Sequence, residues 1–369
     1  MSTKNPLVRL TELGQSPWYD FITRDLFTSG TLQHLIDAGE LRGMTSNPTI
    51  FEKAVSKSDL YDEDIRRLSR EGRTPAQIFE AIAVADVRSA CDLFRPLYDK
   101  TNGGDGLVSI EVSPGVAFDT QASINEARRL WHEVDRPNAM VKIPGTEAGL
   151  EAIRQCLTEG ININITLLFS VQRYDQVREA FLSALEARVA KGQPIDRLAS
   201  VASFFVSRVD TKVDKILDKQ GDPDKLRGTI AIANAAQAYA AFEATFDGAR
   251  WAPLEAKGAQ RQRPLWASTS TKDPKYPDIY YVEALIAPDT VDTIPPATLD
   301  AYRDHGDPKV RIREAMARAP EQLRQLARSG IDLAQVTAEL EKEGVEKFAA
   351  SYDELLAGIE HKAGELAAR

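Results

Sequence analysis

A lysine lies near the end of an apolar segment in the stretch VKIPGTEAG, residues 141–149. Lysine is among the residues least often fully buried, because its charge is costly to remove from water. Lys142 therefore has two interpretations. Either its side chain extends from a strand end to reach water, or it lies where removal from water favours the neutral amine, which is a nucleophile. The polar residues elsewhere in the chain decide between them.

Polar residues occur at or near the ends of several other apolar segments. If these segments were the strands of a barrel, their polar residues would converge on one mouth, where barrel enzymes build their active sites. The segments are WYDFI with Asp20, TSNPT with Thr45, Ser46 and Asn47, LVSIEVS with Ser109, Glu111 and Ser113, ININITLLFS with Asn162, Asn164 and Thr166, ASFFVSRVD with Ser203 and Arg208, and WASTSTK with Ser268, Ser270 and Lys272.

Each of these residues has a simpler explanation when it is taken alone. Asp20 could form a turn or cap a helix, and Asn47 could cap the helix that follows it. Glu111 could pair with an exposed lysine, and Arg208 could form a surface ion pair. The polar alternation of residues 161–166 could face water in an antiparallel sheet. Taken together, however, these groups are the equipment for imine chemistry on a phosphorylated, hydroxylated carbonyl compound.

Short apolar runs alternate with longer amphipathic segments along most of the chain. This alternation favours an α/β fold with a parallel sheet that is covered on both faces. Helices are expected over residues 31–38 and 171–189, where apolar residues recur at spacings of three and four, and at Thr74–Pro75, which has the residues of a helix start. Strands are expected at 18–22, 41–45, 107–112, 140–143, 161–166, 198–205, 265–269 and 291–294.

The arrangement of these strands favours a barrel over a doubly wound sheet. No GxGxxG turn follows an early strand, and the NGGDG segment at 102–106 precedes a strand, so it is interpreted as a turn. Residues 1–369 are expected to form a single (β/α)8 TIM barrel domain with additional C-terminal helices, 295–369 being an appended helical cover. A separate helical domain over 295–369 with its own partner is the alternative.

Composition and charge argue against several other classes of protein. The 369 residues carry 55 acidic and 46 basic side chains, and this net charge of −9 leaves no basic stripe for nucleic acid. No apolar run is long enough to cross a bilayer, and the N-terminal residues lack the apolar core of a signal peptide. Cys91 and Cys156 favour a reducing cytoplasm over a disulfide framework. The four histidines are too scattered for a zinc site, so no metal is expected.

Taken in order, these segments resemble the transaldolase family, the class I Schiff-base aldolases of the pentose phosphate pathway. The resemblance extends over about residues 15–295 and is greatest to the longer bacterial branch of the family. TSNPT and NITLLFS are specific when the lysine segment lies between them. The resemblance is carried by WYDFITRDL, GMTSNPTIFEKA, SIEVSPGVAFDT, MVKIPGTEAG, GININITLLFS, ASFFVSRVD and WASTSTK.

The resemblance implies that Lys142 forms the Schiff base, which decides between the two interpretations of that lysine. It also implies that Asp20 and Glu111 transfer protons and that Thr166 positions a water beside Glu111. The residues that match substrate-binding positions are Asn47, Asn164 and Ser203 for donor hydroxyls or the imine, and Arg208 for phosphate.

The WASTSTK segment departs from the better-known members of the family. Those members have an arginine shortly after an alanine–serine pair, whereas this chain continues from Ser268 to Lys272. Lys272 is expected to take over the second phosphate contact, and Ser268 is also expected to bind substrate.

The implied reaction moves a dihydroxyacetone unit from sedoheptulose 7-phosphate to glyceraldehyde 3-phosphate, which gives erythrose 4-phosphate and fructose 6-phosphate. It needs no metal or organic cofactor, because the protonated imine accepts the electrons. Members of the family are often dimers, so a homodimer is expected. One alternative is an aldolase that releases free dihydroxyacetone, and another is a non-catalytic protein that binds sugar phosphates.

Overall fold

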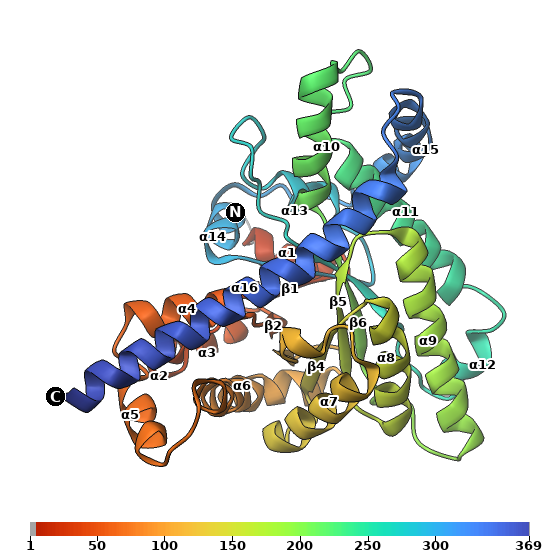
Figure 1. The fold of residues 1–369 in the computed structure, drawn as a ribbon. Helices are drawn as coiled ribbons and strands as arrows, with labels where there is room; N and C mark the ends of the chain where they lie inside the picture. The colour runs from red at the N-terminus through yellow and green to blue at the C-terminus, as the bar shows by residue number, and fades with distance from the viewer. Residues whose placement is uncertain (1–4, 369) are drawn as a thin grey trace.

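A closed barrel of parallel strands forms the centre of the structure, and helices surround it (Figure 1). The barrel closes where β1 pairs with β8. The structure is a computed structural model that describes residues 5–368, apart from the side chains of residues 56, 57 and 368; residues 1–4 and 369 of the expected domain lie outside it. The strands are β1 (Gln15–Asp20), β2 (Gly43–Thr45), β3 (Leu107–Glu111), β4 (Ala139–Pro144), β5 (Ile163–Leu168), β6 (Ser200–Phe205), β7 (Arg263–Ala267) and β8 (Thr290–Ile294).

The predicted (β/α)8 barrel is confirmed, and each expected strand overlaps an observed one. The bounds differ by a few residues. The largest extension is in β1, which begins three residues earlier than expected because Gln15, Ser16 and Pro17 pair with β8. The strand predicted at 161–166 is displaced to β5, Ile163–Leu168, where a register shift between Ile165 and Leu168 carries the strand past Thr166.

Large side chains fill the lower interior of the barrel, below the strand ends that carry the polar residues. Trp18, Met140, Leu265 and Val291 are fully buried there and belong to one apolar cluster. Gly43 lies beside Trp18 in the parallel register, and a Cβ atom at this position would lie only 2.4 Å from the indole ring. The absence of a side chain at Gly43 therefore makes room for the tryptophan that closes the barrel interior.

The helices pack around the barrel as the amphipathic segments predict. Thr74 caps α6 in a capping box with Gln77, and Pro75 occupies the first turn, as expected. The helices before β8 are α1 (Pro6–Glu12), α2 (Arg24–Thr28), α3 (Thr31–Asp37), α4 (Pro48–Lys57), α5 (Asp62–Arg70), α6 (Pro75–Lys100), η1 (Pro114–Val116), α7 (Thr120–Val134), α8 (Glu147–Glu159), α9 (Val171–Ala190), α10 (Ser207–Gln220), α11 (Ile230–Phe246), α12 (Ala252–Glu255) and α13 (Tyr280–Ala284).

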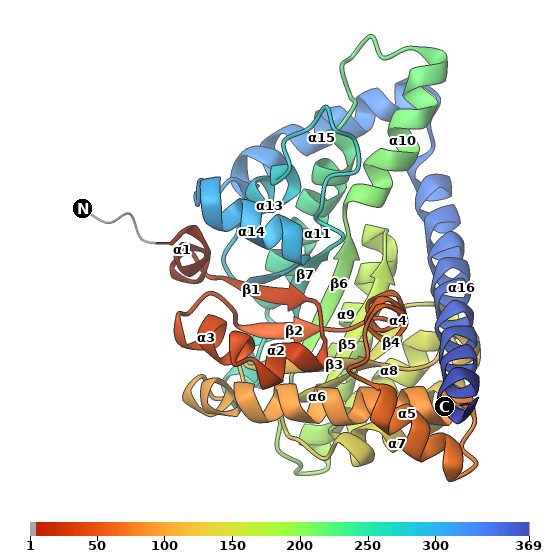
Figure 2. The same cartoon turned by 90° about the vertical axis from the view of Figure 1, so that its left-hand side faces the viewer.

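After β8 the chain continues as α14 (Pro296–His305), α15 (Ile312–Arg328) and the long α16 (Leu333–Ala368). Figure 2 shows α16 crossing the side of the barrel toward which the arrows of β1 and β2 point. Ion pairs tie both halves of this helix to the barrel: Lys212 of α10 contacts Glu343, and Lys362 contacts Asp62 of α5 at 2.7 Å. The helical tail therefore lies over the carboxyl ends of the strands.

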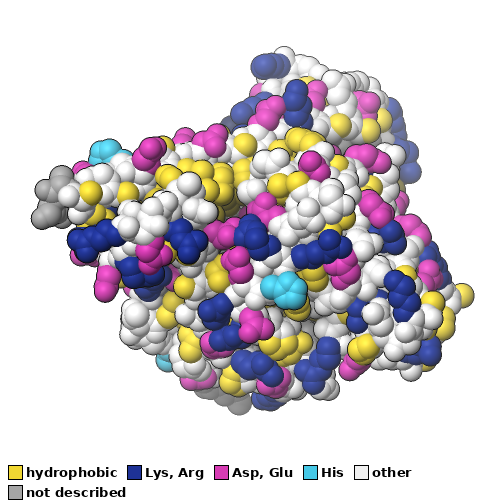
Figure 3. Space-filling model, turned by 60° about the horizontal axis from the view of Figure 1, so that its bottom comes forward, with side chains coloured by type: hydrophobic (Ala, Val, Ile, Leu, Met, Phe, Trp, Pro, Cys, Tyr) yellow, Lys and Arg dark blue, Asp and Glu magenta, His cyan; other side chains and the backbone are white. Residues whose placement is uncertain are grey.

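No helix among the described residues is long and apolar enough to cross a membrane. On the face shown in Figure 3, basic and acidic side chains are interspersed. Cys91 and Cys156 are both buried and free, in α6 and α8 respectively.

Asp292 of β8 is a buried carboxyl group outside the barrel mouth, and Thr269 donates a hydrogen bond of 2.9 Å to it. Burial raises the pKa of Asp292 to about 8. Between its ordinary value and 8 the folded state keeps a proton that the unfolded state releases, so this group lowers stability progressively as the pH rises through that window. Asp292→Asn keeps the acceptor for Thr269. We expect it to raise the free energy of unfolding at pH 7 by up to about 4 kcal/mol.

Urea denaturation of the wild-type protein and the Asp292→Asn variant at several pH values measures this effect. The gain should be largest near neutral pH and should shrink toward pH 4. A gain that is independent of pH would mean that Asp292 is ionised in the folded protein.

Candidate active site

A pocket of about 640 Å³ opens at the carboxyl ends of the strands, beneath α16. Nine of the ten predicted site residues line it, and Asn164 lies immediately below. They reach the pocket from different parts of the barrel: Asp20 ends β1, Asn47 follows β2, Glu111 ends β3, Lys142 and Thr166 belong to β4 and β5, Ser203 belongs to β6, Arg208 begins α10, and Ser268 and Lys272 follow β7.

Lys142 and Glu111 form a buried pair at the base of the pocket. They are register partners on the adjacent strands β4 and β3, and Lys142 Nζ lies 3.5 Å from Glu111 Oε2. Lys142 Nζ also donates to the backbone carbonyl of Ser46 at 3.3 Å. Burial raises the pKa of Glu111, and the positive charge of Lys142 opposes that rise. The side chain of Lys142 is 9% exposed, which contradicts the interpretation that it extends into water.

Asp20 lies on the neighbouring side of the same lysine. Thr45 donates a hydrogen bond of 2.8 Å to its carboxylate, and Asn47 Nδ2 lies at 3.5 Å. Burial raises the pKa of Asp20, while Lys142, Thr45 and Asn47 act in the opposite direction. Asp20 is therefore neither a helix cap nor a turn residue. Asn47 meets both expectations: it lies beside Asp20 at the pocket, and it caps α4, where its Oδ1 accepts from the Ile50 amide.

Asn164 is fully buried and held on both sides by hydroxyl groups. Its Nδ2 donates to Ser109 Oγ at 3.0 Å, and its Oδ1 accepts from Ser203 Oγ at 2.6 Å. Asn164 is also the register partner of Lys142. Because the strands are parallel, the alternative of a water-facing antiparallel strand at residues 161–166 is wrong.

Thr166 contributes a buried hydroxyl group that makes no hydrogen bond within the described part of the chain. A buried hydroxyl group normally has a partner, either protein or water. The residue after it, Leu167, has a φ of 60°, in the left-handed region that non-glycine residues seldom adopt. This kink coincides with the register shift in β5, and it places Thr166 at the pocket.

Arg208 and Lys272 supply positive charge on the far side of the pocket. The guanidinium of Arg208 lies 5.1 Å from the centroid of the Phe205 ring. Burial lowers the pKa of Arg208, and Glu343 of α16 opposes this effect. Burial and the charge of Arg208 lower the pKa of Lys272, which donates to Ser270 Oγ at 2.6 Å. No ion pair of Arg208 occurs among the residues that the structure describes, contrary to the surface-pair interpretation.

Ser268 joins the loop after β7 to the start of α10. Its hydroxyl lies 3.0 Å from Ser207 Oγ, and its carbonyl accepts from the Ser207 amide. Ser268 has a φ of 57°, so the backbone turns sharply at this point. These contacts join the loop after β7 to the start of α10, one residue before Arg208.

Sequence reasoning missed the part of the pocket that α16 supplies. Gly344, Lys347, Phe348 and Ser351 line it, at the three- and four-residue spacing of one helix face. Ser351 accepts from Thr49 of α4 at 2.9 Å, which anchors this face over the pocket. The sequence analysis expected helices over 295–369, but it had no means of telling which part of the barrel they cross.

A parallel barrel with a buried lysine, two carboxylates and two cations at its mouth has the composition of a Schiff-base aldolase. The chain matches the model of the family described as Transaldolase/Fructose-6-phosphate aldolase over residues 17–359. This protein belongs to that family.

Its relatives resemble it along almost their whole length. The protein called Transaldolase in Acidothermus cellulolyticus is 51% identical over 96% of each chain. The Transaldolase of Frankia alni is 48% identical over 98% of each chain, and the Transaldolase 2 of Nostoc sp. is 46% identical over 97% of each.

Proposed function

We propose that this protein is a transaldolase of the non-oxidative pentose phosphate pathway. It transfers a dihydroxyacetone unit from sedoheptulose 7-phosphate to glyceraldehyde 3-phosphate through a Schiff base on Lys142. The single observation that carries the proposal is the buried Lys142–Glu111 pair, 3.5 Å apart at the base of a pocket with cations on its far side. The relatives named transaldolase, aligned over nearly the full chain, support the same reaction.

In the first step, the neutral amine of Lys142 attacks the C2 carbonyl of the ketose phosphate, and water leaves the carbinolamine. This loss of water needs a group that donates a proton to the leaving oxygen. The position of Glu111 beside Nζ and the rise of its pKa on burial support its proposed role as this donor. The buried hydroxyl of Thr166, which has no partner among the described residues, supports its proposed role of holding the water.

In the second step, Asp20 removes the proton of the C4 hydroxyl and the C3–C4 bond breaks. The electron pair enters the protonated imine, so the aldose phosphate leaves and an enamine remains on Lys142. The enamine attacks the acceptor aldehyde, and hydrolysis then releases the new ketose. Burial raises the pKa of Asp20, which makes its carboxylate a stronger base than an exposed aspartate. No metal or organic cofactor is required for these steps.

Asn47, Asn164 and Ser203 hold the hydroxyl groups of the donor and the imine. The Ser203–Asn164–Ser109 chain of hydrogen bonds supports this role, because it fixes the amide below the pocket floor. Arg208, with Ser268 and Lys272, binds the phosphate, and the planar guanidinium suits that group.

Phosphate recognition yields the first test of these roles. Arg208→Ala should raise the KM for fructose 6-phosphate roughly tenfold to hundredfold, because it removes a charged hydrogen-bond donor. Lys272→Ala should act in the same direction and more weakly, since Lys272 is the more exposed of the two. Steady-state kinetics with fructose 6-phosphate and with unphosphorylated fructose measure the difference.

The matched control is Lys215→Ala, which removes an exposed cation from the same helix as Arg208 and leaves the pocket untouched. It should leave both KM values unchanged. If Arg208→Ala impairs phosphorylated and unphosphorylated donors equally, Arg208 has a structural role instead.

Product analysis tests the reaction itself. Purified protein with fructose 6-phosphate and erythrose 4-phosphate should form sedoheptulose 7-phosphate and glyceraldehyde 3-phosphate. Free dihydroxyacetone as the main product would identify the aldolase instead, and binding without any turnover or imine would identify a non-catalytic protein. Assembly as a homodimer and a cytoplasmic location also belong to the proposal, and sedimentation velocity tests the first of them.

A further inference from the structure

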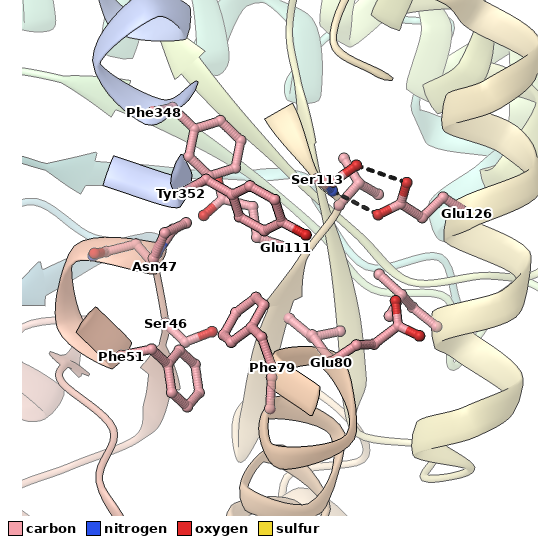
Figure 4. Close-up of a pocket in the computed structure, with 15 residues that line it drawn as sticks. Ser46, Asn47, Phe51, Phe79, Glu80, Glu111, Ser113, Glu126, Phe348 and Tyr352 are labelled. Atoms are coloured by element: carbon pink, nitrogen blue, oxygen red, sulfur yellow. Dashed lines mark hydrogen bonds between the residues drawn. The ribbon is translucent and has the colours of Figure 1, made fainter. Parts of the chain in front are cut away.

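A small cavity, called here the side chamber, lies behind Glu111 on the side away from the cations. It has a volume of about 30 Å³, which is room for roughly two water molecules. Figure 4 shows Phe348 and Tyr352 on one side of it, Phe51 and Phe79 on the opposite side, and the hydrogen-bonded pair Ser113 and Glu126 beside it.

The inner wall of the side chamber is shared with the active-site pocket. Glu111, Asn47, Pro48 and Phe348 line both cavities. A molecule in the side chamber would therefore face the carboxyl group that the proposed function uses for the water steps. It would reach Glu111 from the side of α6 and α7, and not through the active-site pocket.

The outer wall is shared with a groove of about 660 Å³ on the protein surface. Glu80, Ser113, Glu126 and Tyr352 line both the side chamber and this groove. The side chamber thus lies between Glu111 and the surface groove, and the residues of its outer wall border both cavities.

Tyr352 of α16 is the largest member of that outer wall. Its ring packs edge-on against Phe79 at a centroid distance of 5.8 Å, and Phe79 packs against Phe51 in the same way at 5.3 Å. Burial, Glu126 and Glu80 raise the pKa of Tyr352 to about 12, so its hydroxyl remains a proton donor near these two carboxylates.

The rest of the outer wall is polar and held in place. Glu126 accepts hydrogen bonds from the amide of Ser113 at 2.6 Å and from its hydroxyl at 2.9 Å, and Glu80 pairs with Arg129. The side chamber is too small for a sugar but has room for water. Its outer wall combines the Tyr352 ring with polar side chains that are held by hydrogen bonds and an ion pair.

The proposed reaction creates a need for such a passage. Imine formation breaks the C2–O bond and releases one water, and hydrolysis of the imine consumes one water to break the C2–N bond. No oxidant or reductant takes part. A donor that extends from Lys142 to Arg208 and Lys272 occupies the mouth during both steps, so water would have to pass the bound sugar.

We propose that the side chamber is the water route of the Schiff base, and that the Tyr352 ring restricts the entry of solvent along it while the three-carbon intermediate waits for its acceptor. The proposal rests on the proposed transaldolase function and adds that the helical tail sets the balance between transfer and hydrolysis. Exclusion of water from a closed site is a general means of preventing the hydrolysis of a reactive intermediate.

The first test opens the outer wall. Tyr352→Ala should raise the release of free dihydroxyacetone from fructose 6-phosphate, relative to transfer to erythrose 4-phosphate, by at least roughly threefold. Tyr352→Phe keeps the ring and should retain the wild-type ratio. The matched control is Leu355→Ala, which removes a fully buried side chain from the same helix outside the side chamber. It should lower the melting temperature and leave the ratio unchanged.

The second test fills the side chamber. Ala83 of α6 lines it, and Ala83→Val adds two methyl groups there. We expect slower exchange of ¹⁸O from labelled water into the C2 carbonyl of fructose 6-phosphate, by at least roughly threefold, with KM unchanged. Ala81→Val adds the same atoms to the outer groove and should exchange at the wild-type rate.

The outcomes separate this inference from the proposed function. If the wild-type protein shows no transfer, the proposed function is wrong. If the wild-type protein transfers normally but Tyr352→Ala releases no more dihydroxyacetone than Leu355→Ala, or Ala83→Val exchanges ¹⁸O at the wild-type rate, then water takes another route and the inference is overturned.

Discussion

Lys142→Ala is expected to abolish transfer, with a loss of at least about ten-thousandfold in kcat, because it removes the amine that lies beside Glu111 and would form the covalent intermediate. Wild-type protein treated with fructose 6-phosphate and borohydride should carry a reduced three-carbon or whole-sugar adduct. Peptide mass spectrometry should locate it in AMVKIPGTEAGLEAIR, at Lys142. The Lys142→Ala variant should fold and show no adduct.

Lys53 provides the matched control for this experiment. It lines the same pocket from α4, but it is exposed, whereas Lys142 is buried beside Glu111. Lys53→Ala should therefore keep the adduct at Lys142. An adduct on another lysine in the wild-type protein, or full transfer by Lys142→Ala, would contradict both the assignment and the mechanism built on it.

The proximity of Lys142 and Glu111 could be predicted from the sequence because it depends on strand order alone. Successive strands of a parallel barrel are neighbours, so polar residues at the ends of β3 and β4 must meet. The same argument brings Asp20 and Asn47 together from β1 and the end of β2. The order of the strands and the place of each residue at a strand end were sufficient to predict that these residues lie together.

The geometry of Thr166 could not be predicted in the same way. Its placement depends on the register shift in β5 and on the left-handed backbone of Leu167, a conformation that a leucine does not signal. Strict alternation along residues 161–166 identified the threonine but not the kink that follows it.

The contribution of α16 was also beyond the sequence. A helical tail was expected over 295–369, yet the path of α16 depends on distant contacts such as Lys362 with Asp62 and Thr49 with Ser351. These contacts join residues about three hundred positions apart, and no local pattern reports them. Phe348 and Tyr352 therefore became candidates only when the structure placed them beside Glu111.

Glu111→Gln is expected to lower kcat by about a hundredfold to ten-thousandfold, the usual contribution of a general acid or base. Glutamine keeps the size of the side chain and its place beside Lys142, but it cannot give or take the proton that the water steps need. Since Glu111 lies on the opposite side of the pocket from Arg208 and Lys272, the KM for fructose 6-phosphate should change little. Binding of phosphate ligands should also persist.

Rapid-quench experiments with borohydride distinguish this effect from a loss of fold. The adduct on Lys142 should still form in Glu111→Gln, but it should accumulate far more slowly than in the wild-type protein, and ¹⁸O exchange should slow in parallel. Glu151→Gln is the control, because it makes the same change at an exposed carboxylate of α8 that lies outside both the active-site pocket and the side chamber. It should form the adduct at close to the wild-type rate. Turnover by Glu111→Gln at the wild-type rate would remove Glu111 from the proton transfers and leave Asp20, on the other side of the lysine, as the group that must manage the water.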